Sequence, residues 1–450
     1  MKKYKGYTII DNPRLRVYTK GEYERLGNRL RTFDMQSEIP IEDLKMLQTF
    51  RTSYKEPLSQ VFEILRKSIL KIDKNAIVTY RVKRIESIIS KLKRLDKAQL
   101  PRIEDIAGCR CILKNNEQVY RLKEILKDEL YIKSDRNDYI ANPKPDGYKS
   151  LHLIVQTKNR ESNPIEIQLR CEKDHNWATL VEIVDQIYNT KIKELGNENE
   201  LGRLLLLLSV EINSLKKDEL VELIDLIIKK EFVGKISSVF FNNSIKVRKQ
   251  WSEINKKSGN NFYLIRVDKQ NNSYISSFSS FNGAERIYFQ EFQANPSWNM
   301  VLTHIPDAKF EQIAKAYSNY TLTYHDFMQD FSSKLQELVK IAFVENKTKE
   351  FIKYFTLFVQ TYFETAKLQY NELLIMNKTK CKGLKKYEWE SDLKQRIEKI
   401  INGRKKLFSD MQVRRINLYQ YYFDYKMKKI WRMYANTFAV ETYEMYQCLK

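Results

Sequence analysis

A short loop rich in proline and glycine most constrains how this chain can fold. Residues 143–147 read Pro-Lys-Pro-Asp-Gly, and two prolines with a glycine exclude a helix and favour a turn. The mostly apolar run at 151–155 then predicts a buried strand. Tyr148 lies where loop and strand meet, a place from which an aromatic ring can stack on a purine base. The segment therefore predicts either a turn that holds a nucleotide or simply a rigid loop ahead of a strand.

A row of basic residues precedes this loop. Lys83, Ser87 and Lys91 recur every four residues, which predicts that they share one helical face, with Arg94 close to the same line. Cations with one hydroxyl suit a polyphosphate. The ordinary alternative is a solvated basic face of a helix.

Two further segments predict strands that carry charged side chains. Residues 102–113 hold an apolar strand that is entered through Asp105 and carries Arg110. Residues 165–170 alternate apolar and polar side chains. This alternation predicts that three polar residues share one face of the strand, namely Glu166, Gln168 and Arg170.

In their order and spacing, these segments closely resemble the synthetase domain of the RelA/SpoT family of pyrophosphotransferases, over about residues 75–190. The specific parts are the Asp-Ile-Ala-Gly-Cys-Arg strand, the Pro-Lys-x-x-Gly-Tyr-x-Ser-Leu-His loop, and the Glu-Ile-Gln-Leu-Arg strand followed by His-x-Trp-Ala. Cys171 stands where the family usually has threonine, which we interpret as a tolerated small side chain. The family's zinc-dependent hydrolase half is not expected, because the N-terminal segment has no His-Asp pair.

The resemblance implies a mixed β-sheet flanked by helices that transfers the β,γ-diphosphate of ATP onto a ribose 3′-hydroxyl, with Mg²⁺ as cofactor. Asp105 and Glu166 match the two catalytic carboxylates that bind the metal, and Glu166 would also activate the hydroxyl. The positions that match the ATP-binding residues are Arg81, Lys83, Ser87, Lys91 and Arg110.

On the acceptor side, the resemblance implies that Tyr148 stacks on the base, with His152 and Lys144 as neighbouring contacts. Gln168 and Arg170 are further candidates on the same strand. Glu104 and Glu182 are expected to be surface or salt-bridge residues.

Composition narrows the class of protein. No apolar run approaches the roughly 18 residues of a membrane helix, so neither a membrane partner nor a signal peptide is expected. Five scattered cysteines without metal-ligand spacing predict a reducing cytoplasm. The net charge of +22 favours a polyanionic partner, although excess lysine can also serve solubility alone.

The length of 450 residues leaves room for further units, and we expect an α+β chain. The expected organisation is a helical N-terminal segment (1–74), the synthetase domain (75–200), a helical connector (201–232) whose apolar helix runs from about 204 to 230, a small α/β regulatory domain (233–332) and an all-helical extension (333–450). In the extension, basic and aromatic residues are interleaved, which suits either single-stranded nucleic acid or packing between helices.

The 233–332 segment predicts strands near 262–268, 274–276 and 299–303, with helices near 283–293 and 308–316. Its order resembles the antitoxin-like domain of CapRel-type fused toxin–antitoxin members of the family, which ends in a Tyr-x-x-Tyr motif. Tyr317 and Tyr320 match that motif, whereas Ser318 replaces the usual proline and Thr323 a usual aspartate. The alternative is two tyrosines that merely pack at a helix end.

Three functions remain open from the sequence. The chain could be a toxin that pyrophosphorylates the 3′ end of tRNA, silenced until a trigger such as a phage protein binds. It could instead make (p)ppGpp from GDP or GTP. A catalytically dead scaffold is the third alternative, and the intact Asp105, Tyr148 and Glu166 argue against it. For the toxin, we expect Tyr317 and Tyr320 to dock near Arg81, Lys83 and Lys91 and occlude ATP.

Overall fold

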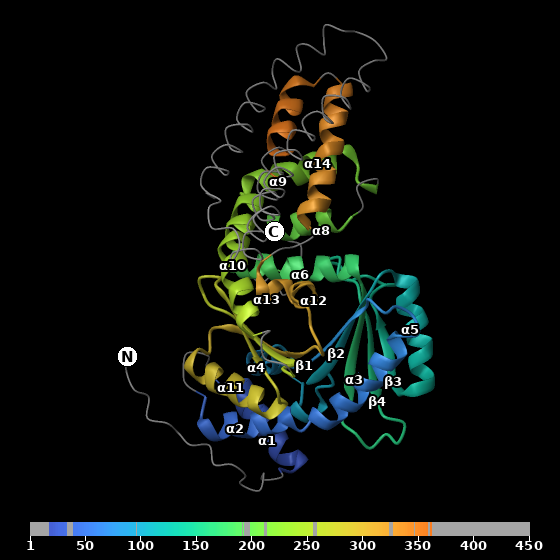
Figure 1. The fold of residues 1–450 in the computed structure, drawn as a ribbon, viewed down its shortest axis with the longest axis vertical. Helices are drawn as coiled ribbons and strands as arrows, with labels where there is room; N and C mark the ends of the chain where they lie inside the picture. The colour runs from blue at the N-terminus through green and yellow to red at the C-terminus, as the bar shows by residue number, and fades with distance from the viewer. Residues whose placement is uncertain are drawn as a thin grey trace, which may run out of the picture.

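The computed structural model describes residues 18–33, 39–95, 97–190, 192, 199–210, 214–254, 259–323, 327–345, 347–358 and 361. Within them a mixed β-sheet is flanked by helices, and a group of helices extends away from one side of it (Figure 1). The α+β class with a mixed sheet, expected from the sequence, is confirmed.

Eight strands form one continuous sheet in the order β3-β4-β5-β2-β1-β8-β6-β7. In chain order the strands are β1 (Ile77–Val82), β2 (Ala107–Leu113), β3 (Tyr131–Asp138), β4 (Leu151–Gln156), β5 (Ile165–Cys171), β6 (Phe262–Val267), β7 (Ser273–Phe278) and β8 (Asn299–His304). The pair β2·β5 is parallel, and the other neighbouring pairs are antiparallel.

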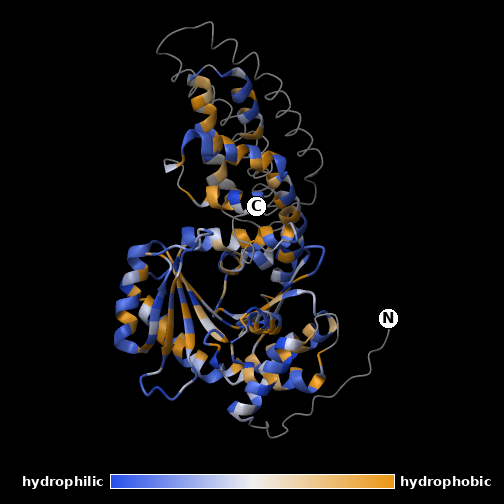
Figure 2. Cartoon of the chain, turned by 180° about the vertical axis from the view of Figure 1, so that it is seen from behind, coloured by the Kyte–Doolittle hydropathy of each residue, from blue (hydrophilic) through white to orange (hydrophobic). Residues whose placement is uncertain are grey.

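The sheet is covered on both faces by apolar cores. One core gathers side chains from α1 (Lys20–Thr32), α2 (Ile41–Thr52), α3 (Lys55–Ile69), α4 (Ile85–Arg94), α5 (Asn116–Glu129) and α11 (Phe281–Ala294), together with η1 (Leu100–Arg102). The other core gathers side chains from α6 (Glu172–Ile187), α8 (Glu200–Ser209), α9 (Lys217–Lys229), α10 (Phe232–Ile254), α12 (Phe310–Ala316), α13 (Ser318–Thr321) and α14 (Phe327–Val344). Apolar residues follow the strands and the helix sides that meet them (Figure 2).

The strands and helices expected between 233 and 332 are present. Their three strands extend the sheet beyond β1, in the order β8-β6-β7. Two residue pairs join β1 to β8, Tyr80 with His304 and Arg81 with Thr303. The Thr303 hydroxyl also donates to the Tyr80 carbonyl at 3.0 Å, and the His304 ring stacks on the Tyr80 ring at 4.7 Å. The last strand of the C-terminal segment therefore lies directly beside the first strand of the N-terminal one.

The helices after the synthetase segment differ in part from the expectation. The single apolar helix expected from about 204 to 230 is wrong, because α8 ends at Ser209 and α9 begins at Lys217. Neither proline nor glycine stands between Ser209 and Lys217 to mark this break, and apolar residues recur across it in the sequence. Within the described residues, no helix is both long and apolar enough to span a bilayer. Most of the basic, aromatic extension expected at 333–450 lies outside the described residues.

Candidate active site

The proline and glycine loop is a fixed turn that places Tyr148. The Asp138 carboxylate accepts hydrogen bonds from two loop amides at 3.1 and 3.0 Å. Gly147 adopts φ +87°, a left-handed conformation that favours glycine, and its amide donates to the Lys144 carbonyl at 2.8 Å. The Asp146 carboxylate accepts from the Tyr148 amide at 3.0 Å. The backbone on both sides of the ring is thus held before any ligand binds.

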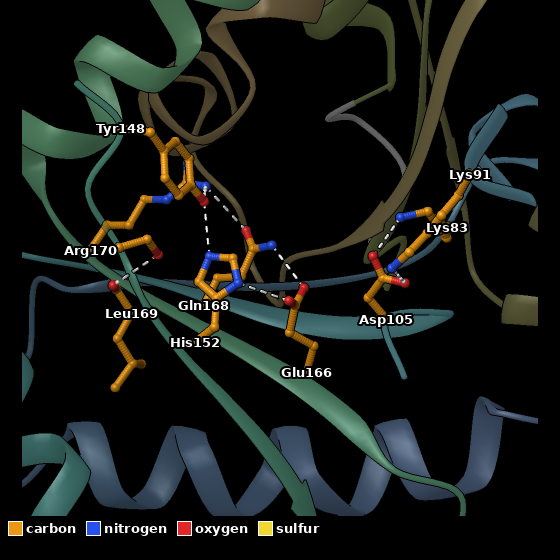
Figure 3. A network of polar contacts seen from close by, with 10 residues as sticks. Lys83, Lys91, Asp105, Tyr148, His152, Glu166, Gln168, Leu169 and Arg170 are labelled. Atoms are coloured by element: carbon orange, nitrogen blue, oxygen red, sulfur yellow. Dashed lines mark hydrogen bonds and ion pairs between the residues drawn. The ribbon is translucent and has the colours of Figure 1, made fainter. Parts of the chain in front are cut away.

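A chain of hydrogen bonds runs from Arg170 through Tyr148 and His152 to Glu166 (Figure 3). Arg170 Nη2 donates to the Tyr148 hydroxyl at 2.5 Å, and that hydroxyl lies 2.8 Å from His152 Nε2. His152 Nδ1 lies 2.9 Å from Glu166 Oε1, and Gln168 Nε2 donates to Glu166 Oε2 at 2.8 Å. Residues of the loop, β4 and β5 together therefore fix the orientation of the Glu166 carboxylate.

This chain shifts the pKa values of its members. Burial raises the pKa of Tyr148, but Arg170 and His152 outweigh it and lower the pKa to about 7. Burial lowers the pKa of His152, and its contact with Glu166 reverses this to a net increase. Burial raises the pKa of Glu166, and the hydrogen bond from His152 turns this into a net decrease. Glu166 is thereby kept as a carboxylate, the form that can bind a cation or accept a proton.

Asp105 and Glu166 line one small cavity of about 60 Å³. Asp105 precedes β2 and Glu166 lies on β5, the two strands that pair in parallel. Gly108 is opposite Glu166, and a Cβ at Gly108 would lie 2.9 Å from the Glu166 carbonyl oxygen. A side chain at Gly108 would therefore clash with the β5 backbone beside the cavity that the two carboxylates line.

Two lysines converge on Asp105 (Figure 3). Lys83 Nζ lies 2.6 Å from Asp105 Oδ2, and Lys91 Nζ lies 2.8 Å from Oδ1. Burial raises the pKa of Asp105, but the two ammonium groups dominate and lower it to about 2. The expected helical face from Lys83 to Lys91 is wrong in one respect, because α4 begins at Ile85 and Lys83 lies in the turn between β1 and α4. The two lysines meet at Asp105 nevertheless.

A larger polar cavity of about 940 Å³ adjoins the small one, since Arg81 and Lys83 line both. Ser87 also lines the larger cavity. Arg84, the residue after Lys83, lines the larger cavity too. Arg84 falls outside the four-residue spacing, and its place within the Arg-Val-Lys-Arg run is the one sequence signal for it.

The segment from Ala316 to Tyr320 lies against two arginines, Arg110 and Arg84. Arg110 Nη1 donates to the Ala316 carbonyl at 3.1 Å, and its guanidinium carbon lies 5.7 Å from the centre of the Tyr317 ring. The Arg84 guanidinium carbon lies 5.9 Å from the centre of the Tyr320 ring. Tyr317 lines the small cavity and Tyr320 the large one.

The Tyr317 hydroxyl is tied into the sheet. It donates to Thr79 Oγ1 at 3.1 Å, and it lies 2.7 Å from Thr303 Oγ1. Thr79 belongs to β1 and Thr303 to β8, the two strands that join the N-terminal and C-terminal parts. The ring itself is 1% exposed. Tyr317 therefore closes one side of the cavity that holds the two carboxylates.

The remaining candidates lie as follows. Lys144 Nζ lies 5.0 Å from the centre of the Tyr148 ring, and the Arg170 guanidinium carbon lies 4.9 Å from it. The ring thus contacts cations in this structure, and its stacking on a base stays a prediction. Glu104 pairs with Lys133 at 2.7 Å on the surface. Glu182 accepts from the Asn319 amide and lines the large cavity.

The donor set suits a magnesium ion that is shared with a substrate. In the described part of the chain no group of three or more potential ligands gathers in one place. Asp105 and Glu166 nevertheless supply hard carboxylate oxygens to one cavity. Mg²⁺ is commonly held by one or two carboxylates together with substrate phosphates. The residues present therefore fit the ion that the sequence implies.

Comparisons with known proteins relate one part of the chain to a known family. Residues 80–192 match the family model described as the region found in RelA/SpoT proteins. The chain is 35% identical over 130 residues to the GTP pyrophosphokinase YwaC of Bacillus subtilis, covering 26% of this chain and 62% of that protein. It is 35% identical over 127 residues to the GTP pyrophosphokinase YjbM of the same organism, covering 26% of this chain and 59% of that protein. The chain thus spans about three-fifths of the length of these relatives.

Among solved structures, small alarmone synthetase 1 of B. subtilis bound to its product pppGpp is 27% identical. The match covers 34% of this chain and 86% of that chain, with a TM-score of 0.29.

Proposed function

Because residues 80–192 are a synthetase domain of the RelA/SpoT family, we propose that this chain is an ATP-dependent pyrophosphotransferase. The observation that carries the proposal is the shared cavity of Asp105 and Glu166, with lysines on one side and the Tyr148 chain on the other. This order provides a place for phosphates, a place for a hydroxyl, and carboxylates between them.

Each residue has a role in this proposal. Lys83 and Lys91 hold the transferred phosphates, with Arg81, Ser87 and Arg110 as further donors. Glu166 takes the proton of the attacking 3′-hydroxyl. Asp105 and Glu166 would hold Mg²⁺, which neutralises phosphate charge when it is bound. Tyr148, His152 and Lys144 orient the acceptor, beside Gln168 and Arg170.

We further propose that the acceptor is the 3′ end of tRNA and that the described conformation is silent. Arg110, a proposed ATP-binding residue, is held by the chain's own segment at Ala316 and Tyr317. Such self-occlusion suits a toxin, which must be inactive until it is triggered. The net charge of +22 suits a polyanionic acceptor. The CapRel-type assignment of residues 233–332 and a phage protein as trigger remain part of this proposal.

The energy of the closed contact supports reversible control. Each cation–π contact contributes about 0.5–2 kcal/mol, and each hydrogen bond of Tyr317 about 1 kcal/mol. The closed state would then lie a few kcal/mol below an open one. A partner that binds the 316–320 segment tightly enough can reverse such a balance.

A second candidate is synthesis of (p)ppGpp from GDP or GTP, and the two B. subtilis relatives favour it, since both are GTP pyrophosphokinases. A guanine nucleotide would use the same carboxylates and the same Tyr148 chain. The two candidates therefore differ in the acceptor and not in the chemistry.

The test offers γ-labelled ATP and Mg²⁺ with GDP, GTP or bulk tRNA in parallel. Wild-type protein is compared with a Tyr317→Ala/Tyr320→Ala variant, and the same variant carrying Glu166→Ala is the control. We expect label transfer to tRNA by the double variant, little by the wild type, and none by the triple variant. Transfer to GDP or GTP alone would select the second candidate, and transfer that persists without Glu166 would contradict the assigned chemistry.

A further inference from the structure

A buried polar cluster lies on the face of the sheet opposite to Tyr317. Arg51 of α2 is 1% exposed, and its Nη1 lies 3.2 Å from Glu285 Oε2 of α11, which is also buried. The Arg51 guanidinium carbon lies 4.6 Å from the centre of the Tyr288 ring, one turn further along α11. Gln48 donates to the same Glu285 oxygen at 2.8 Å. The cluster thus joins the N-terminal helices to a helix more than 200 residues away in the sequence.

This cluster holds the backbone of the turn between β1 and α4. Arg51 Nε donates to the Lys83 carbonyl at 2.8 Å. The Ile85 amide, one of the donors that a helix start leaves unpaired, donates to the Tyr288 hydroxyl at 3.2 Å. On the strand side of the turn, the Lys83 amide donates to the carbonyl of Ile106, the residue after Asp105, at 2.7 Å. The peptide groups on both sides of Arg84 are therefore fixed.

Two of the proposed donor-site side chains, Lys83 and Ser87, leave the chain at or beside this turn, together with Arg84, which lines the same large cavity. Lys83 points to Asp105, Arg84 points to the larger cavity, and Ser87 follows within the first turn of α4. A shift of the turn would move all three at once. A buried ion pair such as Arg51–Glu285 contributes little net stability. The hydrogen bonds from this cluster to the backbone of the turn therefore indicate its role better than the ion pair does.

We propose that Arg51, Glu285 and Tyr288 are positioning residues for the donor site, and that α11 belongs to the scaffold of that site. This inference rests on the proposed function, in which Lys83 and Ser87 face ATP. The region after residue 232 then has two opposed roles. Tyr317 and Tyr320 occlude the donor site from one face of the sheet, while α11 shapes it from the other face.

The decisive variant is Tyr288→Phe in the full chain carrying Tyr317→Ala/Tyr320→Ala. It keeps the ring and removes the acceptor of the Ile85 amide. We expect hydrogen exchange of residues 83–88 to accelerate roughly tenfold, and binding of a non-hydrolysable ATP analogue to weaken by roughly five- to twentyfold. In turnover, KM for ATP should rise while kcat changes little, because the reacting groups remain.

Two matched controls separate positioning from general destabilisation. Tyr263→Phe removes another buried hydroxyl, which donates to the Asn260 carbonyl at 3.0 Å. Glu291→Gln weakens an ion pair on the same helix, with Arg266 at 2.6 Å, and is compared with Glu285→Gln. Both controls should leave exchange at 83–88 and analogue binding unchanged.

The proposal is overturned if Tyr288→Phe and Tyr263→Phe change analogue binding and local exchange equally, or if neither changes them. Exchange and analogue binding need no turnover, so they decide the matter even where no acceptor is pyrophosphorylated and the proposed function itself fails. If Glu285→Gln does not fold, the Tyr288→Phe comparison still stands.

Discussion

Tyr148 should ionise near neutral pH, and Arg170 should be the main reason. The phenol of an ordinary tyrosine has a pKa of about 10, whereas Arg170 and His152, against the effect of burial, lower the pKa of Tyr148 to about 7. At pH 8 Tyr148 would then be about 90% phenolate, while an ordinary tyrosine would be about 1% phenolate. The perturbation that tests this is Arg170→Met, which removes the charge and keeps much of the apolar stem.

The size of the effect follows from the short distance between the Arg170 guanidinium and the Tyr148 hydroxyl, which Arg170 contacts directly. Two unit charges about 4 Å apart interact by about 4 kcal/mol at an effective dielectric constant of about 20, which corresponds to about three pKa units. The partly exposed ring reduces this, so we expect Arg170→Met to raise the pKa of Tyr148 by about two units. The phenolate fraction at pH 8 would fall from about 90% to about 10%.

The assay is a pH titration of tyrosinate absorbance. The chain has 28 tyrosines, so the signal of one phenolate is obtained as the difference between wild type and Tyr148→Phe. A group with a lowered folded-state pKa contributes stability that is complete above the unfolded pKa of about 10 and is lost as the pH falls through about 7. The stability advantage of wild type over Tyr148→Phe should therefore grow as the pH rises from 7 towards 10. Coincident titration curves of the two proteins between about pH 6 and pH 9 would refute the reasoning.

Three further outcomes are expected. Tyr148→Ala should raise KM for the acceptor far more than KM for ATP, because base stacking contributes about 1–3 kcal/mol; equal losses would place the ring on the ATP side. Gly108→Ala should destabilise the fold by about 1–3 kcal/mol in thermal unfolding, because its Cβ would lie 2.9 Å from the Glu166 carbonyl, whereas Gly234→Ala, with nothing within 4 Å, should not destabilise it. Removing residues 362–450, which leaves α14 in place, should flatten the salt dependence of tRNA binding if the basic extension contacts phosphates; an unchanged slope would assign that extension another role.

The parts of the site that lie within one continuous motif could be predicted from the sequence. Glu166, Gln168 and Arg170 alternate along β5 and hydrogen-bond to one another, as a two-residue period requires. Lys83 was misplaced because the four-residue spacing of Lys83, Ser87 and Lys91 runs unbroken from the turn after β1 into α4. Local periodicity does not register such a boundary.

The parts that depend on distant partners could not be predicted. The pairing of β1 with β8 and the contact of Arg51 with Glu285 join segments more than 200 residues apart. An alternating strand pattern names the face that is buried but not the neighbouring strand. Arg51 looks like any cation on an amphipathic helix until the fold places a carboxylate beside it.

The long sequence distance between β1 and β8 also sets an order of events during synthesis on the ribosome. Until β8 emerges, β1 is an edge strand, and until α11 emerges, the turn after β1 lacks one of its supports. Tyr317 follows the end of α11 by about 23 residues, which translation covers in on the order of one to five seconds at about 5–20 residues per second. On the proposed scheme, the nascent chain completes its donor site only moments before it makes the segment that closes it, so a ribosome producing this protein is exposed to the active form for very little time.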